Sequence, residues 1–193
     1  MQTAEAIRRR RTVRRFRQEP VSRRILEDLV DAARLAPSAS NLQPLKYIVV
    51  DDPGQVSAVF DQVKWAAYLA PEGTPAEGER PVVFIAVLVD TEIRRNGYEL
   101  DIGAACGQLL LAAVDAGLGA CWMGAINRTE IIRILEIPEQ YLLNTVVALG
   151  YPAEEPVAED ETGSIRYYKD AEGVLHVPKR KKKDILVGFN RAE

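Results

Sequence analysis

Apolar residues recur with helical spacing in the first part of the chain. Residues 4–10 predict a short helix, and a longer helix follows Ser22, whose hydroxyl suits a helix N-cap. Pro37 ends that helix, and residues 36–44 predict a loop of small and polar side chains. Residues 47–50 predict a short strand and residues 53–67 a further helix. The apolar stripe of the long helix comprises Ile25, Leu26, Leu29, Val30, Ala33 and Leu35.

The middle of the chain holds the segments that we expect to be most buried. Residues 82–89 are apolar throughout, which predicts a strand covered on both faces. Residues 100–116 predict a helix that is apolar or small nearly all round, and such a helix must be buried on most sides. Full burial is easier if a second subunit covers one face. The remaining predictions here are a loop at 70–81, strands at 120–123 and 145–149, and a helix at 130–135.

The pattern changes at residue 151. Residues 151–193 contain little continuous apolar sequence and cannot form a core of their own, so we expect an extended arm that lies over the domain or over a neighbour. Within the arm, residues 165–168 and 174–177 predict two short strands. Strands and helices do not alternate regularly, so the chain predicts one domain, residues 1–193, of the α+β class.

Composition narrows the function classes. The chain has 193 residues and a formal net charge of −3, which gives no global attraction to nucleic acid or membrane. The longest apolar run is too short to span a bilayer, and no secretory signal is evident. Cys106 and Cys121 lie far apart, in no metal or redox spacing. We therefore expect a cytoplasmic protein without a metal site.

The segment RRRRTVRRF at residues 8–16 is the first candidate for chemistry. Guanidinium groups match phosphate geometry, and a neighbouring hydroxyl can add a hydrogen bond. A solvated basic face is the commoner outcome for an isolated arginine run. A nucleic-acid contact is a third reading, which the short run and the acidic total charge disfavour.

Three further segments are weak signals when each is taken alone. APSASNLQP at residues 36–44 is either a helix-ending turn or a rigid loop that offers polar groups to a heterocycle. GLGACWMG at residues 117–124 is either a helix C-cap and strand or a place where the backbone approaches a flat ligand. HVPKR at residues 176–180 holds the single histidine and begins a basic tail, and both are usually structural or solvated.

Together with GYP at residues 150–152, the order and spacing of these segments resemble the nitroreductase family of flavoproteins along nearly the whole chain. The resemblance implies a nitroreductase-like fold with a mainly antiparallel central sheet flanked by helices. It also implies a homodimer that exchanges C-terminal arms between subunits and binds FMN in a cleft built from both.

The resemblance also implies roles for individual residues. Arg10 and Thr12 would hold the phosphate and ribityl end of FMN, and Arg14 would lie near the polar edge of the flavin. Met123 and Gly124 would present backbone to flavin N5. Less specific candidates are Arg11 in the arginine motif and Lys64 for the pyrimidine edge. Lys179 and Arg180 would complete the phosphate site, and the other subunit would contribute the loop that holds Pro37, Ser38, Ala39, Ser40, Asn41 and Gln43.

Two positions depart from the family pattern. Thr12 stands where a serine is usual, which keeps the hydroxyl. Leu45 follows Pro44 where an aromatic residue is common, which alters the packing over the flavin without threatening binding.

The implied activity is hydride transfer from NADH or NADPH to FMN, followed by reduction of a small electron-poor acceptor such as a nitroaromatic or a quinone, in a ping-pong scheme. No side chain need act as a catalytic group, and there is no G-x-G-x-x-G fingerprint for a separate nicotinamide domain. Alternatives are a specialised relative (a reductive dehalogenase, an enone reductase or a flavin-fragmenting enzyme), a non-catalytic flavin-binding redox sensor, and an arginine-rich nucleic-acid module. The loop at 66–80 would distinguish the enzymes as a lid over the flavin.

Overall fold

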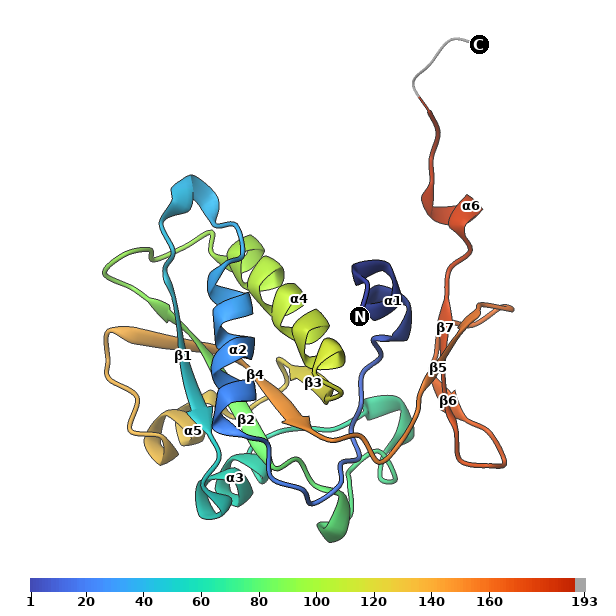
Figure 1. Cartoon of the computed structure of the whole chain (residues 1–193), viewed down its shortest axis with the longest axis horizontal. Coiled ribbons are helices and arrows are strands. Elements are labelled where there is room, and N and C mark those ends of the chain that lie inside the picture. Colours follow the sequence, from blue (N-terminus) through green and yellow to red (C-terminus); the bar gives the residue numbers. More distant parts are fainter. Residues whose placement is uncertain (190–193) are drawn as a thin grey trace.

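The protein is described by a computed structural model that covers residues 1–189. Its centre is a four-stranded antiparallel sheet with the order β1-β2-β4-β3 (Figure 1). The strands are β1 (Leu45–Val50), β2 (Val83–Asp90), β3 (Gly119–Met123) and β4 (Tyr141–Gly150). The prediction of a mainly antiparallel central sheet is confirmed.

Helices cover both faces of this sheet. On one face α2 (Arg23–Arg34) packs against α4 (Glu99–Asp115), and α1 (Thr3–Arg9) contacts α4. On the other face α3 (Pro53–Phe60) and α5 (Arg128–Ile134) contact β2 and β4. The structure is therefore an α/β/α sandwich of the α+β class. Helix α2, which precedes β1, and helix α4, which precedes β3, pack together on the same face of the sheet.

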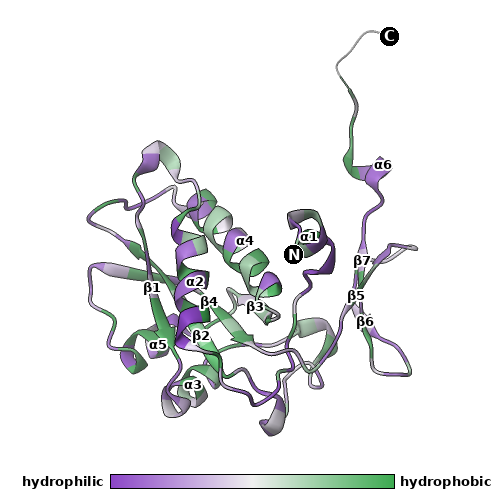
Figure 2. Cartoon of the chain, viewed as in Figure 1, coloured by the Kyte–Doolittle hydropathy of each residue, from purple (hydrophilic) through white to green (hydrophobic). Residues whose placement is uncertain are grey.

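Alternation along β2 supplies both halves of the core. Phe84, Ala86 and Leu88 face the α3/α5 layer, while the intervening valines and Ile85 face the α2/α4 layer. All residues from Val83 to Val89 are buried, as predicted for a strand covered on both faces. Figure 2 shows the central strands as a strongly hydrophobic layer.

One side of α4 packs against the domain and the other does not. Residues such as Ile102, Ala105 and Leu109 are buried, whereas Leu100 is 86% exposed and Gly103, Ala104, Gly107 and Leu111 are only half-buried. Within one chain the helix is thus covered on one side. The second subunit that we expect on the open side stays a prediction.

The arm carries a small sheet of its own. Strands β5 (Val157–Asp160), β7 (Leu175–Lys179) and β6 (Tyr168–Lys169) lie in the order β5-β7-β6, with β5 parallel to β7, and α6 (Lys182–Ile185) follows. Figure 1 shows the ribbon of this sheet to one side of the central sheet, with the chain leading away beyond α6. Residues 190–193 of the predicted arm lie outside the described residues.

Three predicted segments have other bounds in the structure, and one strand was not predicted. The helix predicted over 53–67 ends at Phe60, because Val63 bridges to Ile126 and the Lys64 amide donates to the Ala125 carbonyl at 2.9 Å. The strand predicted at 165–168 shrinks to Tyr168–Lys169. Strand β5 was not predicted because its sequence VAED is half acidic, which is unusual in strands. The predicted strand 145–149 begins earlier, at Tyr141.

Glycine is required at residue 119 for packing. A Cβ there would lie 2.6 Å from Val13 Cγ1, whereas a Cβ at Gly124 would have nothing within 4 Å. We expect Gly119→Ala to lower the free energy of unfolding by ~1–3 kcal/mol, the usual cost of forcing a methyl group into packed structure. Gly124→Ala is the matched control and should change it little.

Urea unfolding of both variants, without bound ligand, measures the difference. Equal stability of the two variants would contradict the close approach of residue 13 to β3.

Candidate functional site

The N-terminal arginine segment lies along the outer edge of β3. Thr12 forms a parallel bridge with Ala120, and the Val13 amide donates to the Ala120 carbonyl at 3.0 Å. We call residues 10–17 the strap. It continues a sheet edge that no strand of residues 1–189 occupies on that side. Its position follows from Gly119, which lets Val13 approach β3.

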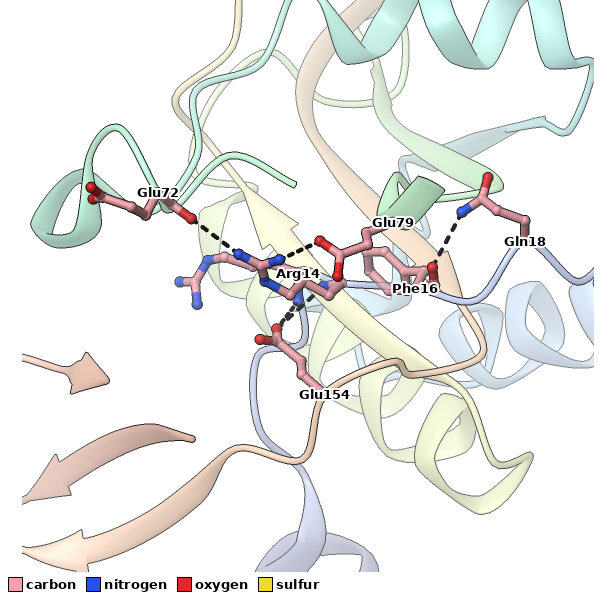
Figure 3. Close-up of polar contacts among 7 residues, drawn as sticks. Arg14, Phe16, Gln18, Glu72, Glu79 and Glu154 are labelled. Carbon is pink, nitrogen blue, oxygen red and sulfur yellow. Dashed lines mark hydrogen bonds and ion pairs between the residues drawn. The ribbon is translucent and has the colours of Figure 1, made fainter. Parts of the chain in front are cut away.

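Two glutamates fasten the strap through its backbone and one side chain (Figure 3). Glu154 Oε1 accepts from the amides of Arg14 at 2.6 Å and Arg15 at 3.3 Å. Glu79 forms an ion pair with Arg15, and its carbonyl accepts from the Phe16 amide at 2.9 Å. The strap is therefore held mostly by main-chain contacts, which leaves the side chains of Arg10, Thr12 and Arg14 available for another task.

Two strap arginines have buried nitrogens without a partner. Arg11 Nε and Arg14 Nε have no hydrogen-bond acceptor among the described residues. Arg11 donates only to the carbonyls of Arg8 and Arg10, and burial, followed by the Arg10 charge, lowers the pKa of its guanidinium. A partly buried cation without a counter-charge is costly. The guanidinium groups of the strap therefore favour the binding of an anion.

A cavity of about 560 Å³ brings together two other predicted residues, Lys64 and Gly124. Gly124 follows β3, and the Met123 carbonyl before it accepts a hydrogen bond from the buried Thr145 hydroxyl. The side chain of Met123 is itself packed in the core, so only its backbone can serve a ligand. The Gly124 backbone lacks the positive φ that favours glycine, and its missing Cβ leaves open space. That space is suited to a flat group.

The loop that contains Pro37, Ser38, Ala39, Ser40, Asn41 and Gln43 lies at the other end of α4. Three of its residues, Ser40, Asn41 and Gln43, have φ of 53°, 55° and 51°. Such left-handed conformations cost energy in non-glycine residues and occur often at ligand sites. Ser38 Oγ accepts from the Gln43 amide at 3.0 Å, and Asp101 accepts from the Ala39 amide at 3.0 Å.

Asp101 is a residue that sequence reasoning missed. It is 4% exposed and pairs with Arg94 at 3.2 Å, so it fixes the loop to the start of α4 with a neutralised charge. An acidic residue near the start of a helix of mainly apolar and small residues was the available signal. Glu154, which holds the strap, was also missed, because its contact with the Arg14 amide joins residues 140 positions apart in the sequence.

The strap and the loop cannot serve one ligand within a single chain. The loop contacts the N-terminal end of α4, and the strap lies by β3, which follows its C-terminal end. A helix of 17 residues is about 25 Å long. The structure thus places the strap near the C-terminal end of α4 and the loop at its N-terminal end, and it brings Lys64 and Gly124 together in a cavity that no strap residue lines.

Lys179 and Arg180 lie at the end of β7 in the arm, where both are exposed. The arm contacts the 66–80 segment: the rings of Tyr68 and Tyr167 are 4.9 Å apart, and the Arg14 guanidinium lies 5.2 Å from the Tyr167 ring. Arg166 lies over the other tyrosine at 4.8 Å. This stack of two arginines and two tyrosines, which sequence reasoning missed, ties the predicted lid segment to the arm beside the strap.

The two cysteines are unpaired and buried. Burial raises the pKa of Cys106 to about 12 and that of Cys121 to about 11. Both are therefore protonated near neutral pH and poor nucleophiles, so a redox function here cannot depend on thiols. No group of metal-ligating side chains occurs within residues 1–189, and no helix there is long and apolar enough to cross a membrane.

Comparison with protein families gives a match to the model described as "Nitroreductase family" over residues 7–151. The chain belongs to the nitroreductase family. The match includes the strap, the loop, Lys64 and Gly124, and it ends where the arm begins. The predicted family, the α+β nitroreductase fold and the oxidoreductase class are thereby confirmed.

Individual relatives cover most of the chain. A protein of Archaeoglobus fulgidus named as an NADH dehydrogenase/NAD(P)H nitroreductase is 33% identical over 153 residues, which is 76% of this chain and 83% of that protein. An iodotyrosine deiodinase of Haliscomenobacter hydrossis is 32% identical over 179 residues, 78% of this chain and 79% of that protein. The fold matches a nitroreductase of Desulfovibrio desulfuricans solved with FMN, with a TM-score of 0.73, 25% identity, and coverage of 100% of this chain and 99% of that one.

Proposed function

We propose that this nitroreductase-family protein is an NAD(P)H oxidoreductase that binds FMN between two copies of the chain and reduces a small electron-poor acceptor. FMN is the cofactor, and NADH or NADPH is the electron donor. The observation that carries the proposal is the pair of buried guanidinium nitrogens of Arg11 and Arg14 that lack an acceptor among the described residues, and the open space at the Gly124 backbone supports it. A phosphorylated, planar, partly anionic molecule fits that combination of groups.

In this proposal the strap binds the charged parts of FMN. The guanidinium of Arg10 and the hydroxyl of Thr12 hold the phosphate and ribityl end, aided by Lys179 and Arg180. Arg14 and Lys64 lie at the polar edge of the ring system, where a cation stabilises negative charge. FMN, when bound, supplies the redox chemistry by accepting hydride from the nicotinamide and passing electrons to the acceptor in a ping-pong scheme. The protein binds FMN, orients it and shields it.

The site needs a second subunit because one chain separates its two halves by the length of α4. A second copy would place its loop, residues 37–43, against the first copy's strap. The half-buried side of α4 supports such pairing, and so does the apolar end of the arm, where Ile185 is 64% and Phe189 82% exposed. A homodimer with exchanged arms buries these surfaces.

The acceptor in the proposal is a nitroaromatic, a quinone or a similar small molecule. The deiodinase relative favours a second candidate, reductive dehalogenation, at the same site. The 66–80 segment, tied by Tyr68 to the arm, is the element that would select between them because it lies beside Arg14. A redox sensor without turnover is the remaining alternative from another class.

The function is tested by the absorbance spectrum of the purified protein and an anaerobic titration with NADH and with NADPH. We expect a yellow protein with about one FMN per chain, bleached by at least one nicotinamide and recoloured by nitroaromatics or quinones. Recolouring by halophenols alone would favour the dehalogenase. Yellow protein that neither nicotinamide reduces would contradict the enzyme and favour the sensor, and a colourless protein that shifts DNA would contradict the whole proposal.

The shared site predicts rescue in hybrid dimers. Arg10→Ala should weaken FMN binding by ~2–4 kcal/mol, the scale for removing a charge-assisted partner in a buried site. Asn41→Gly removes the loop side chain and keeps a residue suited to the φ of 55°. If Arg10 and Asn41 of different subunits share a ligand, a hybrid of the two variants has one site with both changes and one with neither.

Hybrids purified with two different affinity tags should therefore bind FMN at wild-type affinity in about half of their sites. If the two residues act within the same chain, every site of the hybrid carries one change and no tight site appears. A stable monomer that binds FMN normally would equally contradict the shared site.

The substitution Gly124→Val tests whether the flavin occupies the open space beside Gly124, which follows β3. Because a Cβ at this position meets nothing in the chain, the fold should keep its stability while FMN occupancy falls or reduction by the nicotinamide slows sharply. Gly124→Ala should show a smaller effect in the same direction, and Met123→Ala should leave the flavin reducible. Melting temperature, flavin content and anaerobic reduction rate separate these outcomes. A folded, fully yellow valine variant reduced at the wild-type rate would refute this placement.

A further inference from the structure

The single histidine of the chain lies in the arm between two carboxylates. His176 Nδ1 is 2.8 Å from Glu159 Oε2, and His176 Nε2 is 3.0 Å from Asp170 Oδ2. Ionised carboxylates only accept hydrogen bonds, so both ring nitrogens must donate. Only the imidazolium can satisfy both contacts.

The residues around His176 come from each element of the small sheet. Glu159 lies on β5, Tyr168 on β6 and Asp170 in the turn before β7. The Tyr168 ring stacks on the imidazole with centroids 4.9 Å apart and an interplanar angle of 12°, and its hydroxyl donates to Glu159 at 3.1 Å. We call these four residues the clasp. The hydrogen bonds that His176 donates to Asp170 and then to Glu159 raise the pKa of His176, and the bond to Asp170 in turn lowers the pKa of that carboxyl.

The histidine of the clasp lies just before two residues predicted to bind the FMN phosphate. Lys179 is three residues and Arg180 four residues beyond His176 on the same chain segment. Strand β5 holds this end in place, since Asp160 pairs with Lys179 in register and the Glu161 amide donates to the Lys179 carbonyl at 2.8 Å. The sheet has little apolar core, with Leu175 and Pro178 as its buried members. Polar contacts therefore keep its strands together.

We propose that His176 is a positioning residue: as an imidazolium it locks the arm sheet so that Lys179 and Arg180 are presented together to the FMN phosphate. This inference rests on the proposed phosphate role of those two residues. His176 itself touches no ligand. Its protonation and FMN binding are coupled through the geometry of β7.

The sign of the coupling follows from the clasp. Protonated His176 holds β7, so FMN binds more tightly at pH values below the pKa of His176 and more weakly as the pH rises through it. Coupling between two binding events is reciprocal, so FMN must raise the pKa of His176 in turn. A pKa difference of one between the FMN-bound and FMN-free forms corresponds to about a tenfold change in the FMN dissociation constant across the titration.

The experiment is an NMR titration of the imidazole ring protons, which come from one residue and need no assignment. We expect a pKa above the ordinary value for histidine in the FMN-free dimer and a still higher pKa in the FMN-bound dimer. FMN dissociation constants, measured by fluorescence across the same pH range, should rise as His176 loses its proton. An ordinary pKa in both forms, or a raised pKa that FMN does not change, would overturn the proposal.

A phosphate dianion near the arm could also raise the pKa of His176 directly through its charge. Glu159→Gln distinguishes the two mechanisms because it keeps an acceptor for the imidazole but removes the negative charge that stabilises the imidazolium on which the clasp depends. Positioning predicts weaker FMN binding near neutral pH, by roughly the tenfold scale above, whereas direct attraction predicts tighter binding. Glu172→Gln removes the same charge from the exposed turn of the arm, where the side chain does not contribute to the pKa shift of His176, and should leave FMN affinity and the pKa of His176 unchanged.

Three further variants separate the positioning role of His176 from a general loss of folding and from a failure of the proposed function. Tyr168→Phe keeps the stacked ring, loses only the hydroxyl, and should show a smaller effect in the direction of Glu159→Gln. Lys179→Ala and Arg180→Ala should each weaken FMN binding while leaving the pKa of His176 raised. If they do not weaken binding, the phosphate assignment fails and the positioning role with it, although the clasp itself would still be visible in the NMR titration.

Discussion

The contact between the strap and the outer edge of β3 is the constraint on which the rest of the site depends. An edge strand exposes unpaired amides and carbonyls, and the strap occupies them through Thr12 and Val13. This is possible because Gly119 allows Val13 to approach and because one Glu154 carboxylate oxygen accepts from two successive strap amides. The start of the arm is fixed by the same contact, since the Ala153 amide donates to the Arg15 carbonyl at 2.8 Å. The N-terminal segment, the sheet edge and the arm thus form one structural unit.

Much of the fold could be predicted because local pattern and burial agree along most of the chain. The apolar stretch of β2 and the stripe of α2 place these elements without knowledge of their neighbours. The end of α3 and the strand β5 could not be predicted in this way. The first depends on a bridge between Val63 and Ile126, far apart in sequence, and the second on pairing with β7. Tertiary contacts override local propensity at both places.

The residue types of the candidate site could be predicted from the sequence, but the residues that hold them in place could not. The arginine motif and the glycine at 124 can be identified from their spacing and from the family resemblance. Glu154 holds the strap and Asp101 holds the 37–43 loop, and each acts across a long sequence separation. Such pairs leave no periodic trace in a single sequence. The strained loop at Ser40, Asn41 and Gln43 likewise appears only once backbone angles are known.

The way in which the strap is held has a consequence for how this scaffold can evolve. Its hydrogen bonds to Ala120 and to Glu154 involve main-chain groups, so they place no demand on the identity of the side chains at 10, 12 and 14. Substitutions there change what the molecule recognises at little cost to stability, since loss of stability is what eliminates most mutations. In this short segment the side-chain atoms determine what is recognised, whereas the main-chain atoms hold the segment on the fold. A scaffold arranged in this way can exchange one chemistry for another by a few substitutions, while the sheet beneath it stays intact.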